Sequence, residues 1–287
     1  MIYGKNEVVE SLKNIRNLPS VPQIMLEISN VLRNDSHTQN DITKLIGKDQ
    51  SLTTKLLSIA NSPLFGLPRK VSSIDVAVML IGEEELSNIV IALSMLEAIK
   101  FDSQSNFDYM DYWKHSMIVA AVSKNIAKNL GFKDLAADAF VAGMLHDLGI
   151  QILVKYFKTE YEEIYNKFRN EGLSFFEAEN VVIGCSHQEI GEFLLQKWSF
   201  PESMCKVLAD HHSPLKDVEE NKIGCIVNLS DYIVDKYQMG NVFWDEGTQI
   251  DERMLPVFGF SDREALNEFI DGFEETLKEQ VGSLSLI

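Results

Sequence analysis

Pro68 and Pro201 bound the longest stretch of this chain that contains no proline. Proline breaks helices because it lacks a backbone N–H and because its ring clashes with the preceding turn. The stretch is also rich in Ala, Leu, Glu, Lys and Met, which are strong helix formers. No segment shows the alternation of apolar and polar residues that predicts strands. The chain is therefore predicted to be all-α.

Three Ser-x-x-Glu patterns predict where individual helices begin. In such a capping box the serine accepts a hydrogen bond from the third backbone amide of the helix, and the glutamate bonds back to the serine amide. The patterns are Ser174-x-x-Glu177, Ser186-x-x-Glu189 and Ser261-x-x-Glu264.

Proline is concentrated near the start of the chain, because four of the seven prolines lie within the first 68 residues. Short helices are predicted there, and longer helices in the second half. The polar stretch Asp102–Asn106 separates the two patterns and is the best candidate for a boundary. We therefore expect an N-terminal helical subdomain over residues 1–104 and a second helical subdomain, which carries most histidines, over residues 105–287.

The charge of the chain limits the classes of partner that it can bind. The chain of 287 residues has 26 basic and 43 acidic residues, a net charge of −17. This charge argues against nonspecific binding to nucleic acid or to an anionic membrane, and is compatible with a cation or a basic protein partner. No signal peptide and no apolar run of about 18 residues is recognised. Three cysteines without a CxxC spacing predict buried thiols, and we expect a cytoplasmic protein.

Five of the six histidines lie in the second half, and several have acidic neighbours. His146 is followed by Asp147 within an apolar helical segment, where a carboxylate needs a partner or a metal. His115 stands one helical turn after Asp111, which places both side chains on one helix face. The remaining candidates are His187, the doublet His211-His212, and Asp231 on a largely apolar helix.

Imidazole and carboxylate groups together suit divalent transition metals. Such a set can hold one or two ions of Fe, Mn or Zn. Two such ions would lower the pKa of a bridging water to about 7 and direct it at a phosphorus atom.

The order of these residues resembles that of the HD superfamily of metal phosphohydrolases, and most of all its HD-GYP branch, which cleaves cyclic di-GMP. The resemblance places eight residues on ligand positions, the last of them where some members have an additional carboxylate. These are His115, His146, Asp147, His187, His211, His212, Asp231 and Asp111. If the protein is an enzyme, the resemblance gives Asp147 the catalytic position.

The first half is similar to a narrower family, the HDOD domain. The similarity rests on Leu18-Pro-Ser-Val-Pro22, on Asp49–Gly66 and on Ile74–Gly82, and it runs from about residue 15 to at least residue 235. The HDOD resemblance implies a multi-helix fold, an N-terminal helical part joined to an HD-like part, and a regulatory role in bacterial signalling. It implies a signalling protein partner, and a nucleotide is an alternative ligand.

The chain also departs from active HD hydrolases. Their His-Asp-x-Gly-Lys motif reads His146-Asp-Leu-Gly-Ile150 here, and Ser213-Pro214-Leu215 replaces a Gly-Tyr-Pro loop. The missing lysine would contact a substrate phosphate, and nothing in the sequence assigns Lys114, Lys155 or Lys197 to its place. The sequence favours a regulatory module with a metal site over a phosphohydrolase or phosphodiesterase that acts on a nucleotide or cyclic dinucleotide. A non-hydrolytic metal or ligand sensor, and a hydrogen-bonded polar cluster without metal, remain as alternatives.

Overall fold

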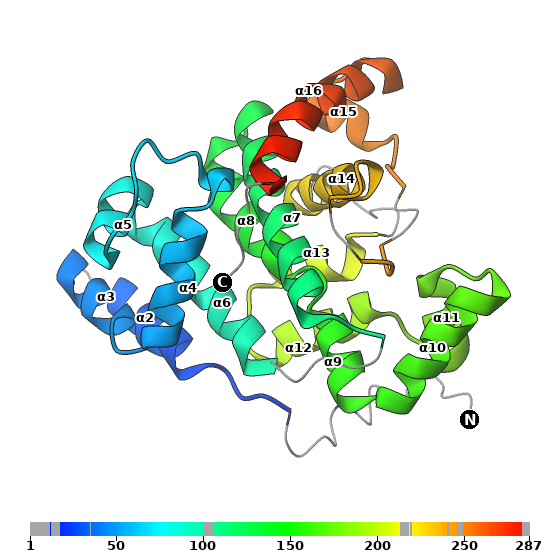
Figure 1. Ribbon diagram of the computed structural model, residues 1–287, viewed down its shortest axis with the longest axis horizontal. Helices are drawn as coiled ribbons and strands as arrows, with labels where there is room; N and C mark the ends of the chain where they lie inside the picture. Colours follow the sequence, from blue (N-terminus) through cyan, green and yellow to red (C-terminus); the bar gives the residue numbers. More distant parts are fainter. Residues whose placement is uncertain are drawn as a thin grey trace. The chain divides into compact units, whose positions relative to one another are not determined.

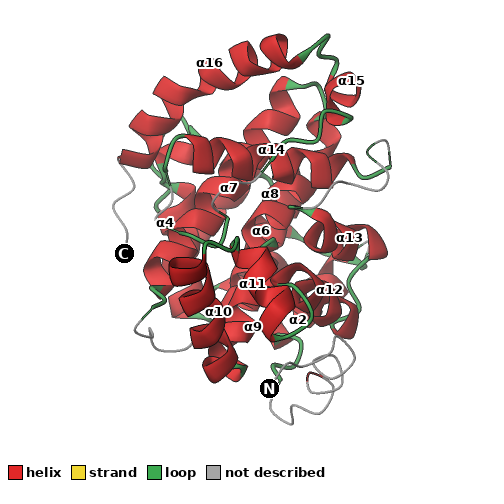
Figure 2. Cartoon of the chain, turned by 90° about the vertical axis from the view of Figure 1, so that its right-hand side faces the viewer, coloured by secondary structure: helices red, strands yellow, loops and turns green. Residues whose placement is uncertain are grey.

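The structure is a computed structural model of the full chain. It describes residues 12, 18–34, 36–99, 106–212, 218, 220–239, 242–245 and 249–282. Every secondary-structure element in these ranges is an α-helix or a short 3-10 helix, as Figure 2 shows by its colours. The predicted all-α class is confirmed.

The described residues fall into two compact units. One is formed mainly by Pro19–Ala98 and the other mainly by Ile99–Asp271, while the helix that ends the described chain belongs to the first unit from Gly272 onward. The main division lies between Ala98 and Ile99, and the boundary expected at residue 104 stays a prediction. The polar residues Asp102–Ser105, on which that expectation rested, lie outside the described residues.

The unit formed mainly by Pro19–Ala98 is built from short helices that follow the proline and N-cap signals. Asp49 and Ser73 cap two of these helices with side-chain hydrogen bonds, and Pro22 stands at the N-cap of the first. Its elements are α2 (Gln23–Leu32), α3 (Gln39–Ile46), α4 (Gln50–Ala60), η1 (Pro63–Phe65), α5 (Ile74–Ile81) and α6 (Glu83–Ile99).

The unit formed mainly by Ile99–Asp271 contains all the candidate ligands. Its elements are α7 (Tyr109–Asn129), η2 (Lys133–Leu135), α8 (Ala136–Leu145), α9 (Leu148–Tyr156), α10 (Lys158–Glu171), α11 (Phe175–Val182), α12 (His187–Lys197), α13 (Glu202–Asp210), α14 (Lys222–Lys236), α15 (Met254–Phe258) and α16 (Arg263–Gly282). Helices α7, α8 and α14 pack against one another, and α12 packs against α9 and α13 (Figure 1). The helices of this unit enclose a core. Several helix ends and helix faces place buried histidines and aspartates in this core.

Two of the three predicted capping boxes are confirmed. Ser174 and Ser186 each accept a hydrogen bond from the amide three residues later, and the paired glutamates bond back. The third prediction is wrong by one residue. Asp262, rather than Ser261, accepts the hydrogen bond from the amide of Ala265, because α16 begins at Arg263 and the aspartate therefore occupies the position before it.

One helical stretch, Lys133–Tyr156, has the length and hydropathy of a membrane span, which the sequence had not led us to expect. Its most apolar window is 89% buried inside the protein, as in the core helix of a globular unit. The stretch is divided at His146 and Asp147, where α8 ends and α9 begins. The apolar flanks of the His-Asp pair are therefore core residues. The three cysteines are buried, as predicted.

Candidate metal centre

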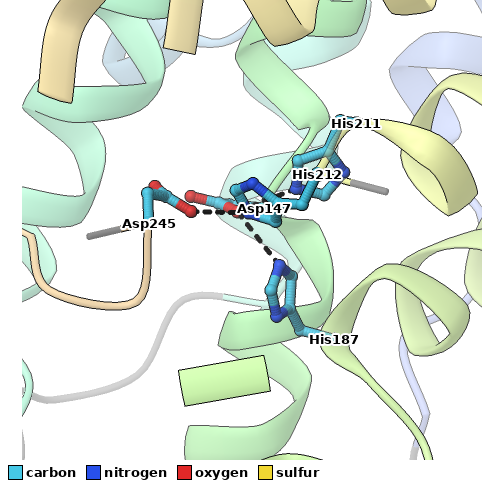
Figure 3. Close-up of side chains that lie close together, drawn as sticks. All are labelled: Asp147, His187, His211, His212 and Asp245. Carbon is cyan, nitrogen blue, oxygen red and sulfur yellow. Dashed lines mark ion pairs between the residues drawn. The ribbon is translucent and has the colours of Figure 1, made fainter. Parts of the chain in front are cut away.

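Seven of the eight sequence candidates converge inside the helical core. They come from α7, from the turn between α8 and α9, from the start of α12, from the end of α13 and from α14, and they are His115, His146, Asp147, His187, His211, His212 and Asp231. All are buried except His212, whose side chain is 13% exposed. Each lies where a helix begins or ends, or on a helix face that is turned into the core. Figure 3 shows four of these side chains, Asp147, His187, His211 and His212, close together with a fifth, Asp245, which the sequence did not predict.

The donor atoms form two overlapping groups. The five-residue group consists of Asp147, His187, His211, His212 and Asp245. The four-residue group consists of His115, His146, Asp147 and Asp245. Within each group, one donor atom from every residue lies within 4.8 Å of all the others. Because Asp147 and Asp245 belong to both groups, their two carboxylates connect the groups.

Asp231 on α14 lies between the two groups. Its Oδ1 is 3.4 Å from Nε2 of His115, and its Oδ2 is 3.5 Å from Nδ1 of His212. The side chain is fully buried. A third carboxylate is therefore shared between histidines of different groups.

Two histidines are oriented by backbone carbonyls one helical turn earlier. Nδ1 of His146 lies 2.7 Å from the carbonyl oxygen of Gly143, and Nδ1 of His211 lies 2.8 Å from that of Leu208. A carbonyl oxygen can only accept, so each Nδ1 carries the hydrogen. In the neutral form of each ring, Nε2 then presents a lone pair toward Asp147, as a metal ligand requires.

His187 is oriented by a buried carboxylate that the sequence analysis missed. Glu179 on α11 lies 2.9 Å from Nδ1 of His187 through Oε1, and it also accepts from the His187 backbone amide at 3.2 Å. Both side chains are fully buried. A carboxylate behind a histidine fixes the ring orientation and strengthens the opposite nitrogen as a ligand.

Several buried donor atoms in this cluster lack a hydrogen-bond partner among the described residues. They are Nε2 of His187, Nε2 of His211 and Oδ1 of Asp147. The two nitrogens lie 3.7 and 3.5 Å from that oxygen, too far for good hydrogen bonds. Two ligands bound to one ion at about 2.0–2.2 Å are roughly 3 to 3.6 Å apart. The 3.5 Å distance lies within this range and the 3.7 Å distance lies just above it, so the atoms are close to the spacing of ligands that share a cation. The donor set fits a divalent transition metal.

The electrostatics leave two histidines neutral at pH 7. Burial and the neighbouring His212 lower the pKa of His211 to about 3, and burial lowers the pKa of His212 to about 4. For His187, burial would also lower the pKa, but the Glu179 and Asp147 carboxylates outweigh it and raise the pKa to about 9. Burial would raise the pKa of Asp147, yet the surrounding histidines hold it well below its usual range.

The segment Val242–Asp245 contributes two further residues that the sequence analysis missed. The indole N–H of Trp244 donates to Oδ2 of Asp147 at 2.7 Å. Oδ2 of Asp245 lies 2.8 Å from Nε2 of His115, and its Oδ1 lies 2.8 Å from Nε2 of His212. The only local signal is an acid after two aromatic residues, and no spacing relates it to the histidines.

Asp111 is the one predicted ligand that the structure does not bring into the centre. It is half-buried in the first turn of α7 and belongs to neither donor group found among the described residues. Its backbone amide donates to the N-cap Asp108. The spacing of four residues to His115 places both on one face, but the site lies beyond His115, where Asp245 supplies the carboxylate. Ile150, which replaces the hydrolase lysine, is fully buried in α9.

Replacing Glu179 with glutamine is expected to lower the affinity for Mn²⁺ or Zn²⁺ by about 10- to 100-fold. The amide keeps the shape of the side chain but loses the charge that strengthens His187 as a ligand. The measurement is a metal titration followed by calorimetry. Glu171→Gln, on the exposed end of α10, is the matched control and should titrate like the wild type. Equal affinities for all three proteins would show that Glu179 does not act on the metal site.

A family model for the HDOD domain matches residues 18–214. The chain belongs to the HDOD domain family. The matched residues include His115, His146, Asp147, His187 and the His211-His212 doublet, whereas Asp231 and Asp245 lie beyond them. The expected family is thereby confirmed.

Two solved structures are similar in fold to this HDOD protein, and one further protein is similar in sequence. An HDOD domain protein of unknown function from Geobacter sulfurreducens is 26% identical, with a TM-score of 0.79 and 97% of both chains covered. A structure from Shewanella amazonensis SB2B, whose name proposes a phosphohydrolase, has a TM-score of 0.72 at 23% identity and covers 96% of this chain and 97% of its own. An uncharacterised protein of Treponema pallidum (strain Nichols) is 26% identical over 212 residues, which are 72% of this chain. The match spans only 40% of the Treponema protein.

Proposed function

We propose that this HDOD protein is a regulatory module of bacterial signalling whose His/Asp cluster binds one or two divalent transition metal ions. Fe, Mn and Zn suit the mixed imidazole and carboxylate donors. The observation that carries the proposal is the convergence of two buried donor groups that share Asp147. The proposed module is cytoplasmic and acts on a signalling protein partner, and a nucleotide is the alternative ligand.

The roles of the residues follow from their positions. His187, His211 and His212 would hold one ion, and His115 and His146 would hold the second. Asp147 would contribute to both, because it is a member of both groups and one of its oxygens faces His187 and His211. Two bound ions would neutralise the buried carboxylates and together link five segments of the chain, namely α7, the α8–α9 turn, α12, the end of α13 and Val242–Asp245. Such a link changes the stability of the unit with metal supply, which is what a regulatory element needs.

Two observations favour regulation over catalysis. Ile150 stands fully buried where the related hydrolases have a lysine, so this position supplies no cation to a phosphate. The donor groups are also mostly buried, because every member is buried except His212, and Asp245, a member of both, is only 3% exposed. A hydrolase centre keeps a coordination position for water or substrate.

The second candidate is a metal-dependent phosphohydrolase. It is favoured by the sharing of carboxylates between two donor groups, which is the arrangement of two-metal hydrolytic sites. When bound, two such ions would supply Lewis acidity and an activated water. The phosphohydrolase suggested by the name of the Shewanella structure belongs to that protein, and at its sequence identity the likeness supports the fold.

Elemental analysis of protein purified without a metal-binding tag tests the proposal. We expect roughly stoichiometric Fe, Mn or Zn in the wild type and its loss from the double variant His146→Ala/Asp147→Ala. Asp111→Ala, which the family pattern counts as a ligand and the structure does not, should keep its metal. Circular dichroism verifies the fold of each sample. Absence of metal from the wild type, even after incubation with these ions, would refute the metal module. Chelator-sensitive release of nitrophenol from bis(4-nitrophenyl) phosphate would favour the hydrolase.

A further inference from the structure

We infer that Asp245 is an intramolecular ligand that closes the metal centre against external anions, and that Trp244 holds it in place. The inference rests on the proposed metal site and concerns its regulation. The segment Val242–Asp245 lies outside the part of the chain that the HDOD model matches. It is therefore an addition to the matched set of histidines.

The carboxylate of Asp245 spans the two donor groups. Its two oxygens lie 2.8 Å from Nε2 of His115, in the four-residue group, and 2.8 Å from Nε2 of His212, in the five-residue group. The side chain is only 2% exposed. A two-oxygen anion in this position occupies the place of a bridging ligand. Phosphate and phosphomonoesters, which also present paired anionic oxygens, would compete for the same place.

Trp244 anchors this carboxylate from the neighbouring position. Its indole N–H donates to Asp147 at 2.7 Å, and its ring stacks on Phe107 at 5.6 Å with an interplanar angle of 21°. The side chain is buried. The hydrogen bond places the segment directly against the carboxylate that both donor groups share. Withdrawal of Trp244 would therefore remove Asp245 from the centre as well.

Phe243 extends the same segment away from the centre. Its ring is half-buried and contacts Phe168 of α10 at 5.6 Å and Phe175 of α11 at 5.6 Å. The guanidinium of Arg169 lies over this ring at 5.4 Å. Contacts of this segment therefore extend from the exposed Arg169 on α10 to the buried donor groups.

The test compares binding of inorganic phosphate to the Mn²⁺-loaded wild type and to Asp245→Ala. Asp245→Ala loses one ligand and is expected to bind Mn²⁺ more weakly, so both proteins are compared at saturating Mn²⁺, which the histidines and Asp147 still hold. We expect Asp245→Ala to bind phosphate at least tenfold more tightly than the wild type. Isothermal titration calorimetry gives the affinity, and the electron paramagnetic resonance spectrum of Mn²⁺ reports whether phosphate enters the coordination sphere. Asp134→Ala, an exposed acid on η2, is the control and should match the wild type.

Two further variants keep the test decisive. Asp245→Asn preserves the shape of the side chain and replaces the alanine variant if the latter does not fold. Trp244→Phe keeps an aromatic ring but loses the hydrogen bond to Asp147, and should give an intermediate phosphate affinity. Equal phosphate affinity in the Mn²⁺-loaded wild type and the Mn²⁺-loaded Asp245 variants overturns the inference. Absence of Mn²⁺ binding by the wild type is a different result and refutes the proposed metal module itself.

Discussion

Replacing Gly149 with alanine is expected to destabilise the protein by about 3 kcal/mol or more. An added Cβ would lie 1.9 Å from the carbonyl oxygen of His187 and 3.0 Å from the amide nitrogen of Gly191. Both are backbone atoms of α12, so no side-chain rotation relieves the overlap. Helices α9 and α12 would have to separate until the closest contact reaches the ordinary 3.4 Å.

The same substitution should also weaken metal binding, because the contact involves His187 and lies two residues after Asp147. Urea unfolding measures the loss of stability, and a Mn²⁺ titration measures the loss of affinity. Gly272→Ala on α16 is the matched control, since a Cβ there meets nothing within 4 Å. It should stabilise the helix by roughly 0.5–1 kcal/mol. A Gly149→Ala protein with wild-type stability would show that α9 and α12 do not approach this closely.

Removal of the metal is expected to lower the melting temperature by roughly 10 °C. A ligand present at a thousand times its dissociation constant adds about 4 kcal/mol to the free energy of unfolding. For a protein of this size, each kcal/mol shifts the melting temperature by roughly 2–4 °C. The physical reason is that the buried carboxylates Asp147, Asp231 and Asp245 repel one another without a cation. Calorimetry before and after dialysis against a chelator, followed by readdition of Mn²⁺, measures the difference.

The cost of metal removal should grow with pH. In the metal-free protein, protonated histidines partly replace the cation, and the pKa of His187 is raised from 6.5 to about 9. A raised pKa in the folded state contributes stability that is complete below the unfolded value of 6.5 and is lost as the pH rises through about 9. The metal-free protein should therefore lose stability over this interval, while the metal-loaded protein does not. Parallel melting curves from pH 6 to 9 would contradict this account.

The helical class and most of the candidate ligands could be predicted from the order of the amino acids. The absence of proline between Pro68 and Pro201 and the two confirmed capping boxes depend on local backbone chemistry, which short stretches of sequence record directly. The histidines were recognisable because His146-Asp147 stands in an apolar helical segment and because the order of the others matches a known pattern. The departure at Ile150 was also readable from one position.

The carboxylates that complete the candidate site could not be predicted, because they depend on how the helices pack. Asp111 is four residues from His115 yet stays outside the donor groups, whereas Asp245 is 130 residues away and contacts the same ring. Glu179 reaches His187 only because α11 and α12 are joined by a short turn that buries both side chains. Contacts of this kind depend on how helices pack, and packing is set by the whole core rather than by the spacing of residues along one helix.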